Sequence, residues 1–263
     1  MRLRQLFPKL NKWHLTIKII PILIGIFVLK LLFHKLGFEL FSLDVLFTSL
    51  IAATVFLMGF LINGVILDYK ESEKLPGDMA SSLEAMYDEA YILNKNKNSK
   101  ITTGFLNYYK DFLKSLNQWF YREERTKNMI EKLHQMNNYF AEFESIMQPI
   151  FLSRMKNEQS NLRKMIIRID YIRDTRFIQP AYAMVEALGL FLVIGLLILK
   201  LELFYESVFF TMLVSFLVVY MISLIKDLDN PFDYSKHGEN GTEVSIKHIH
   251  DLTNRILEQK NNA

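Results

Sequence analysis

Apolar residues are gathered into four long blocks along the chain, two before residue 68 and two after residue 179. A run of about 18 or more apolar residues predicts a membrane-spanning helix, because about 20 helical residues cross the hydrocarbon core of a bilayer. The pattern therefore predicts four transmembrane helices, at residues 17–33, 43–67, 180–201 and 207–225.

The four predicted spans differ in detail. The first carries Lys30 near its far end, and we expect the ammonium to reach the membrane interface along its apolar stem. An uncleaved signal-like segment or an interfacial helix remains the alternative there, since no small-residue cleavage site follows. The second span is longer than a bilayer needs, so it should tilt or continue as a helix into the cytosol. Pro180 suits the first turn of the third span.

The segment between the two pairs of spans is polar and helical in pattern. Its clearest stripe alternates steps of four and three, over about three heptads: Met129, Leu133, Met136, Phe140, Phe143, Met147 and Ile150. Such a stripe is typical of a helix that buries one face, and Pro149 should kink or break it. A second stripe follows at Leu162, Ile166, Ile169 and Ile172.

Residues 80–93 and 105–120 also have a helical pattern, with 94–99 as the predicted loop between them. We expect these helices to form a water-soluble bundle in which the stripes bury one another. A groove that binds a partner protein is the alternative interpretation of the same stripes.

Basic residues flank the spans unevenly. Arginine and lysine are frequent in the N-terminal tail and at both ends of the middle segment, and rare in the connections 37–42 and 201–206. Because positive residues near span ends stay in the cytoplasm, both termini are predicted to be cytoplasmic in a multi-pass cell-membrane protein. The predicted divisions are 1–67 (N-terminal tail and two spans), 68–179 (cytosolic helical region), 180–226 (two spans) and 227–263 (cytosolic tail).

Composition narrows the possible functions. The chain has 10 glycines, 6 prolines and no cysteine, which favours an all-α membrane protein and excludes thiolate sites. A net charge of +3 gives no argument for nucleic acid. No phosphate loop, nucleophile elbow or His-Glu-x-x-His spacing indicates an enzyme. His248 and His250 should point to different faces of an exposed C-terminal helix, so we expect no metal site and no cofactor.

Glu186 lies about two turns into the third span. An ionisable group inside a span is costly and usually faces a partner or a water path. A functional role and a simple interfacial position are both open.

The second span resembles the pore helix of the bestrophin anion channels. The resemblance lies in Phe56-Leu57-Met58-Gly59-Phe60-Leu61-Ile62-Asn63, where a Gly-Phe pair is followed by asparagine. It implies a narrow hydrophobic neck lined by Ala52, Phe56 and Phe60, with Asn63 next along the pore, and the spacing of the first three places them on one helical face. Packing of both rings against lipid or neighbouring spans, with Asn63 bonding another helix, is the alternative.

A second resemblance follows the fourth span. Asp229, Asn230, Pro231 and Phe232 are similar to the Pro-Phe-Gly turn of bestrophins, although Asp233 replaces the glycine. Animal bestrophins continue with an acidic calcium clasp, whereas residues 234–239 here include a lysine. A calcium ion needs six to eight oxygen ligands, so we expect no metal and a bacterial-type member. The stretch 68–71 also departs from the arginine- and tryptophan-rich bestrophin pattern.

Taken as a resemblance, these motifs imply a homo-oligomeric channel, pentameric in the lipid bilayer, that passes chloride or other small anions. The second span would line the pore, and the Asn-Pro-Phe turn would lock the fourth span to a cytosolic vestibule. The rival hypothesis is a membrane-anchored helical interaction or signalling protein without conduction. A lipid-modifying enzyme is a distant third, because no catalytic set is present.

Overall fold

The computed structural model describes residues 13–97, 99–174, 179–234 and 242–258. These residues form eight helices and two very short strands. Contacts divide the chain into two compact units, which are considered separately. Unit 1 comprises Met1–Tyr69, Arg176–Asp229 and Asn240–Thr242, and unit 2 comprises Lys70–Thr175, Asn230–Glu239 and Glu243–Ala263.

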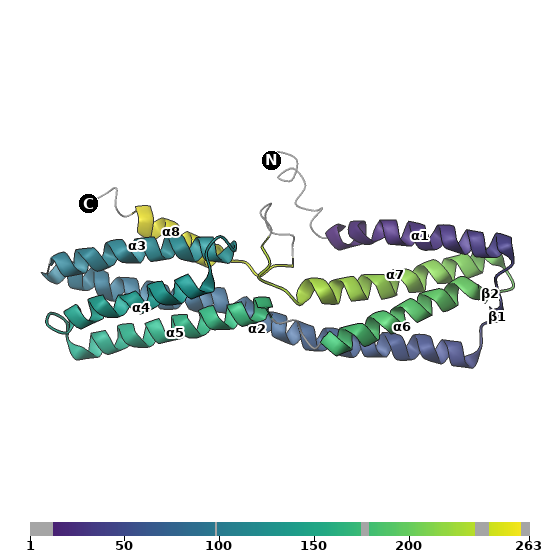
Figure 1. The fold of residues 1–263 in the computed structure, drawn as a ribbon, viewed down its shortest axis with the longest axis horizontal. Coiled ribbons are helices and arrows are strands. Elements are labelled where there is room, and N and C mark those ends of the chain that lie inside the picture. Colours follow the sequence, from purple (N-terminus) through teal and green to yellow (C-terminus); the bar gives the residue numbers. More distant parts are fainter. Residues whose placement is uncertain (1–12, 98, 175–178, 235–241, 259–263) are drawn as a thin grey trace. The chain divides into compact units, whose positions relative to one another are not determined.

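Unit 1 contains the membrane-spanning helices. They are α1 (His14–Leu36), the first part of α2 (Val45–Lys97), α6 (Gln179–Ile198) and α7 (Phe204–Leu228). All four are long and apolar enough to cross a membrane. Figure 1 shows α1 and α2 on opposite sides of the α6–α7 pair. The predicted all-α membrane protein with four transmembrane helices is confirmed.

Two helices end at other residues than the sequence predicted. A glycine cap ends α1, and α2 continues beyond its apolar part. α1 runs to Leu36 and stops because Gly37 adopts a left-handed conformation, with φ of 73°. The Phe38 N–H then donates to the Phe33 carbonyl at 2.9 Å, which satisfies a free helix end. α2 does not end with its apolar part but continues for 53 residues in all. The predicted loop at 94–99 is therefore wrong in extent, since helix persists through Lys97.

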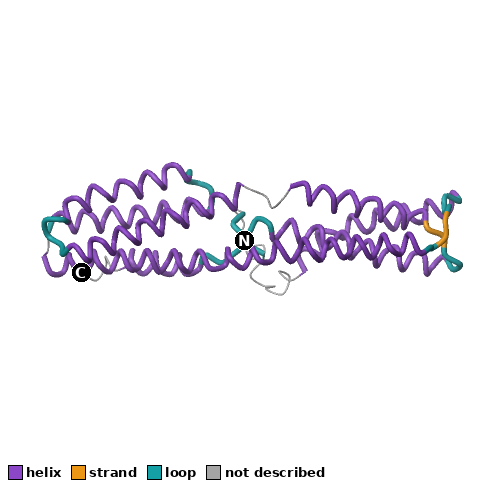
Figure 2. The backbone as a smooth tube through the Cα atoms, turned by 90° about the horizontal axis from the view of Figure 1, so that it is seen from below, coloured by secondary structure: helices purple, strands orange, loops and turns teal. Residues whose placement is uncertain are grey.

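Two short strands join the connections at one end of unit 1. β1 (Phe41–Ser42) pairs in parallel with β2 (Leu199–Lys200), and Figure 2 shows them in orange. The core of unit 1 lies between α2, α6 and α7. It includes Phe47, Met58, Leu61, Val65, Val185, Leu192, Leu196, Val218 and Ile225. Gly189 lets α7 approach α6, because a Cβ there would lie 2.9 Å from Ile222 Cδ1.

Unit 2 combines the remainder of α2 with α3 (Lys100–Phe120), α4 (Thr126–Phe143), α5 (Pro149–Asp174) and α8 (Lys247–Glu258). α3 packs against α4 and α8, and α4 packs against α5. Ser99 caps α3 by accepting a hydrogen bond from the Thr102 N–H at 3.2 Å.

The predicted stripe in unit 2 is buried over most of its length. Met129, Leu133, Met136, Phe140 and Phe143 are fully buried on one face of α4. Ile150, which the pattern placed on the same stripe, is 71% exposed, so that assignment is wrong. The physical reason is Pro149, which lacks an N–H and begins a new helix with its own phase. On α5, Leu162, Ile166 and Ile169 are buried and Ile172 is half-buried.

The C-terminal helix is not the exposed helix that the sequence suggested. Ile249, Leu252 and Ile256 of α8 are buried, and α8 packs on α3. Apolar residues at steps of three and four give α8 one apolar face, which the bundle covers.

Candidate functional site

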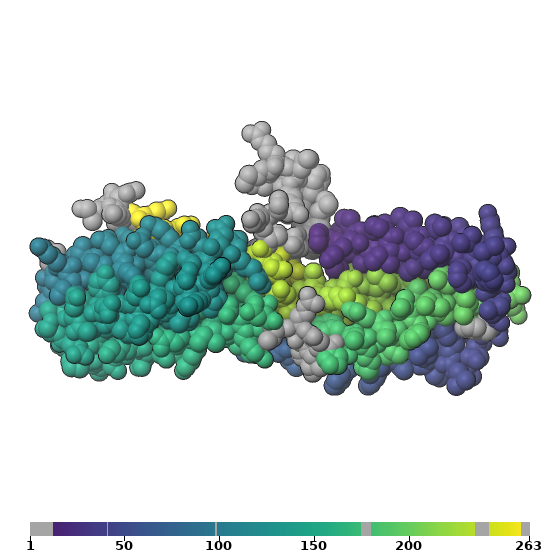
Figure 3. All heavy atoms as spheres, in the orientation of Figure 1, coloured from purple at the N-terminus to yellow at the C-terminus, as the bar shows by residue number. Residues whose placement is uncertain are grey.

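The predicted neck residues share one uncovered face of α2. Phe56 and Phe60 are 72% and 76% exposed, and Ala52 and Asn63 are exposed beside them. The opposite face of the helix enters the core of unit 1. The space-filling view in Figure 3 shows α1 (purple) along the upper surface of unit 1 and α2 (blue) along the lower one. The structure therefore brings these four residues together and leaves them free of intramolecular cover.

This face differs from the uncovered face of α7. On α7 the exposed side chains are large and apolar, and they include Tyr205, Phe209, Phe210, Leu213 and Leu217. On α2, the exposed residues around the two phenylalanines include small or polar ones, namely Ser49, Ala52, Gly59 and Asn63. The Asn63 amide has no hydrogen-bond partner among the described residues. An unpaired amide is costly in hydrocarbon, so the α2 face suits acyl chains less well than the α7 face.

A cavity of about 520 Å³ lies between α2 and α6 beside the neck residues. Its walls are mainly apolar and include Phe60, Leu67 and Met184, while Asn63 supplies a polar side chain. Gly64 and Ala181 also line it, and they contribute little or no side chain to the space between the helices.

The predicted turn begins at the end of α7. The Asp229 N–H donates to the Ile225 carbonyl at 3.1 Å and closes the helix. In unit 2, Phe232 is fully buried and the Pro231 carbonyl accepts from the Val244 N–H at 2.9 Å. The Asp233 N–H donates to the Asn230 carbonyl at 3.3 Å. Phe232 is thus a fully buried aromatic residue in the part of the turn that belongs to unit 2.

Glu186 has a partner in unit 1. Its carboxylate lies 2.6 Å from Lys226 Nζ, in the last turn of α7, and both side chains are about half exposed. The pair therefore links α6 to α7 at the surface of unit 1, where exposed ion pairs contribute little free energy.

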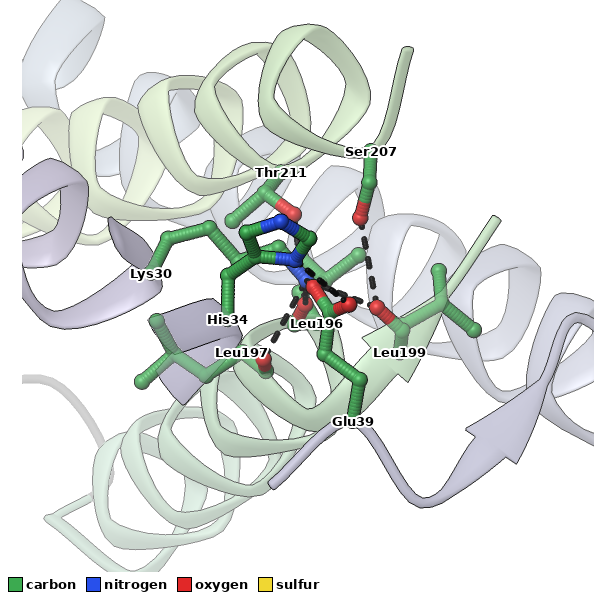
Figure 4. A network of polar contacts seen from close by, with 8 residues as sticks. All are labelled: Lys30, His34, Glu39, Leu196, Leu197, Leu199, Ser207 and Thr211. Atoms are coloured by element: carbon green, nitrogen blue, oxygen red, sulfur yellow. Dashed lines mark hydrogen bonds and ion pairs between the residues drawn. The ribbon is translucent and has the colours of Figure 1, made fainter. Parts of the chain in front are cut away.

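Among the described residues of unit 1, Lys30 is an ionisable group that is fully buried. Its ammonium extends toward the end of the helix pair, as expected, but it meets oxygens of the protein and not open water. Its Nζ donates to the carbonyls of Leu199 at 2.7 Å and Leu197 at 3.2 Å, and lies 3.4 Å from that of Leu196. Figure 4 shows this ammonium turned toward the end of α6. Carbonyls at a helix C-terminus lack intrahelical donors and attract a cation.

Glu39 and His34 complete the cluster. Glu39 Oε1 lies 2.9 Å from Lys30 Nζ, and Glu39 Oε2 lies 3.0 Å from His34 Nδ1. Burial raises the pKa of the Glu39 carboxyl, but hydrogen bonds from His34 and Lys30 and the charge of Lys30 lower the pKa below its ordinary value. The His34 ring stacks on Phe204 at 3.8 Å. Sequence reasoning missed this cluster because its members are up to 169 positions apart.

The histidines near the C-terminus do not converge on a common site. The His250 ring stacks on Tyr121, with Nε2 3.2 Å from the tyrosine hydroxyl, while His248 is exposed. Within the described ranges, no group of three histidine or acidic side chains has the arrangement of a metal site. Residues 235–239, compared above with the calcium clasp, lie outside the described residues.

Comparison with known proteins shows which solved structures share this fold. No protein-family model and no curated protein matches the sequence. Solved structures do match. A variant of a bacterial bestrophin homologue from Klebsiella pneumoniae is 15% identical, with 92% of this chain and 98% of that chain covered and a TM-score of 0.74. A second variant is 14% identical, with 93% and 99% covered and a TM-score of 0.75. The chain therefore has the bestrophin fold.

Proposed function

We propose that the protein is an oligomeric ion channel, pentameric in the membrane, that passes chloride or other small anions through a neck formed by α2. The observation that supports this most is the uncovered α2 face with Ala52, Phe56 and Phe60, in a chain with the bestrophin fold. Around a common axis, copies of this face would form two stacked phenylalanine rings.

Such rings are suited to controlling ion passage. A hydrophobic constriction closes by excluding water, and the edges of phenyl rings carry partial positive charge. A weakly hydrated anion fits this environment better than a strongly hydrated cation. No charged residue lies on the stripe, so selectivity at the neck would depend on dehydration, and Asn63 would offer the next polar contact.

The proposed orientation has both termini and unit 2 in the cytoplasm of a bacterial cell with the spans in its inner membrane. Trp13, just before α1, is 62% exposed, and Tyr205, in the first turn of α7, is 69% exposed. Tryptophan and tyrosine concentrate at membrane interfaces. In the proposed topology, α1 begins at the cytoplasmic surface of the membrane and α7 begins at the opposite surface, so each of these two residues would lie at one interface.

The rival hypothesis, a membrane-anchored interaction protein, drew on the apolar stripe of the middle segment. That stripe packs against other residues of the same chain, since Met129, Leu133 and Phe140 are fully buried. The structure therefore leaves the stripe unavailable for a partner without unfolding of unit 2.

Chloride flux into liposomes that contain the purified protein tests the proposal. We expect flux above that of empty liposomes. Replacing both neck phenylalanines, Phe56→Ala with Phe60→Ala, should widen the constriction. We expect the chloride flux to rise by about tenfold, which corresponds to a barrier lower by about 1.4 kcal/mol. The matched control is Phe209→Ala with Phe210→Ala on the exposed face of α7, which should leave flux unchanged. Absence of flux, or equal effects of both double variants, contradicts the proposal.

A further inference from the structure

Lys30 is a fully buried cation in a helix that crosses the membrane. Such a group is costly unless its partners are fixed around it. Its partners come from two connections at the same end of unit 1: the α1–α2 connection supplies Glu39, and the end of α6 with β2 supplies backbone carbonyls. We propose that Lys30 is a latch that fastens these two connections together and thereby fixes where α2 begins.

The Lys30 ammonium binds both connections at the same time. Its three hydrogens are shared among four oxygens, three from backbone carbonyls and one from the Glu39 carboxylate. The carbonyls themselves have further donors, because Ser207 Oγ donates to Leu199 at 3.2 Å and Thr211 Oγ1 donates to Leu196 at 3.2 Å. The start of α7 is thus tied to the same point (Figure 4).

The other links between the two connections are weak by themselves. β1 and β2 pair over two residues only, and the Leu40 N–H adds one bond to the Ile198 carbonyl at 3.0 Å. A strand pair of this length is not stable alone. Lys30 therefore adds a bridge, from Glu39 to the carbonyls at the end of α6, to a strand pair that is too short to hold alone.

The latch acts on the first turn of α2. Glu39 lies six residues before Val45, where α2 starts, and Asp44 Oδ1 accepts from the Phe47 N–H at 2.7 Å. The Phe47 ring lies directly over Gly195 of α6. Releasing the connection would free this turn from α6. The inference concerns the position of α2 and does not depend on whether the protein conducts ions.

Cysteine labelling tests the latch, because the natural chain has no cysteine. Leu199→Cys places a thiol where the side chain is 2% exposed. In the purified protein in detergent, adding Lys30→Met should increase the rate of maleimide labelling by about tenfold or more, the change expected when about 1.4 kcal/mol of protection is lost. The control is Lys35→Met, a change of an exposed lysine on the same helix, which should leave the rate unchanged.

Two further variants keep the test decisive. Glu39→Gln retains Lys30 and should also accelerate labelling, to a smaller extent, so it decides the matter if Lys30→Met fails to fold. Ser42 and Lys200 are register partners in the β1–β2 pair, at a spacing that a disulfide spans. Oxidised Ser42→Cys with Lys200→Cys should restore the melting temperature that Lys30→Met lowers. Equal labelling rates in folded Lys30→Met, Glu39→Gln and parent proteins would overturn the latch, as would a formed disulfide that restores nothing.

Discussion

At the scale of single residues, two buried cations among the described residues bind the carbonyls at helix ends. Lys30 does so for α6, and Arg173 does so for α3. Arg173 Nη1 and Nη2 donate to the carbonyls of Trp119 and Phe120 at 3.2 and 2.9 Å, and the guanidinium lies 4.5 Å above the Trp119 ring. Burial lowers the pKa of Arg173 to about 10. In both cases the carbonyls at the C-terminal end of a helix offer partial negative charge to the cation, and Lys30 also has the Glu39 carboxylate.

Glu124 makes the stability of unit 2 depend on pH. Hydrogen bonds from the Asn128 amide and the Lys132 ammonium, and one from the Arg125 N–H, lower the pKa of Glu124 to about 2. Because the pKa is lower in the folded chain, the ionised carboxylate stabilises the fold above the ordinary carboxyl range. This contribution disappears as the pH falls through the folded pKa.

We therefore predict that Glu124→Gln lowers the melting temperature of unit 2 at pH 7, and that the difference shrinks between about pH 4.5 and pH 2. Fluorescence of the buried Trp119 reports this transition if Trp13 is replaced by Phe. Glu123→Gln, at the exposed neighbouring position, is the control. A melting-temperature difference that stays constant over this pH range would contradict the assignment.

At the scale of helices, glycine decides how closely the spans approach. Gly195 of α6 faces Phe47 in the first turn of α2, and a Cβ at Gly195 would overlap Phe47 Cε2. Such an overlap requires the phenyl ring or the helix to move. The contact explains why the start of α2 can lie against α6 at this point.

The prediction at this scale is that Gly195→Ala destabilises unit 1 by about 1–3 kcal/mol, the usual cost of overpacking a core. Gly25→Ala on α1 is the matched control, because no atom lies within 4 Å of its Cβ position. That change should be neutral or stabilising by up to about 1 kcal/mol, since alanine favours helix over glycine. Thermal unfolding in detergent measures both.

Adding Phe47→Leu to Gly195→Ala should recover part of the lost stability, because a smaller side chain leaves room for the new methyl group. If Gly195→Ala melts at the same temperature as the natural protein, the close contact between α2 and α6 is not what the structure indicates.

At the scale of the whole molecule, the proposed conduit requires several copies. One chain offers one uncovered α2 face, and a closed ring of identical contacts is needed to enclose a path. We predict that light scattering in detergent gives the mass of five copies of the 31.0 kDa chain. A monomer or dimer would leave Phe56 and Phe60 without a shared axis and would contradict the proposed function, whereas the Lys30 latch would be unaffected.

Much of the architecture follows from the sequence because it depends on local patterns. Hydropathy blocks locate the four spans, since crossing a bilayer requires about 20 apolar residues in succession. Helical spacing places Ala52, Phe56 and Phe60 on one face of α2 and Met129 to Phe143 on one face of α4. The same reasoning failed at Ile150, where Pro149 starts a new helix and resets the phase.

By itself, then, the sequence determined which segments are helices, which can cross a membrane and which side chains share a face. Only the tertiary structure decided what each face meets. It showed that the α2 stripe is uncovered while the α4 stripe is buried, and that Lys30 turns inward to carbonyls 166 to 169 positions away. The physical reason is that periodicity within a helix fixes the direction of a side chain, whereas its burial and its hydrogen-bond partners depend on segments remote in sequence.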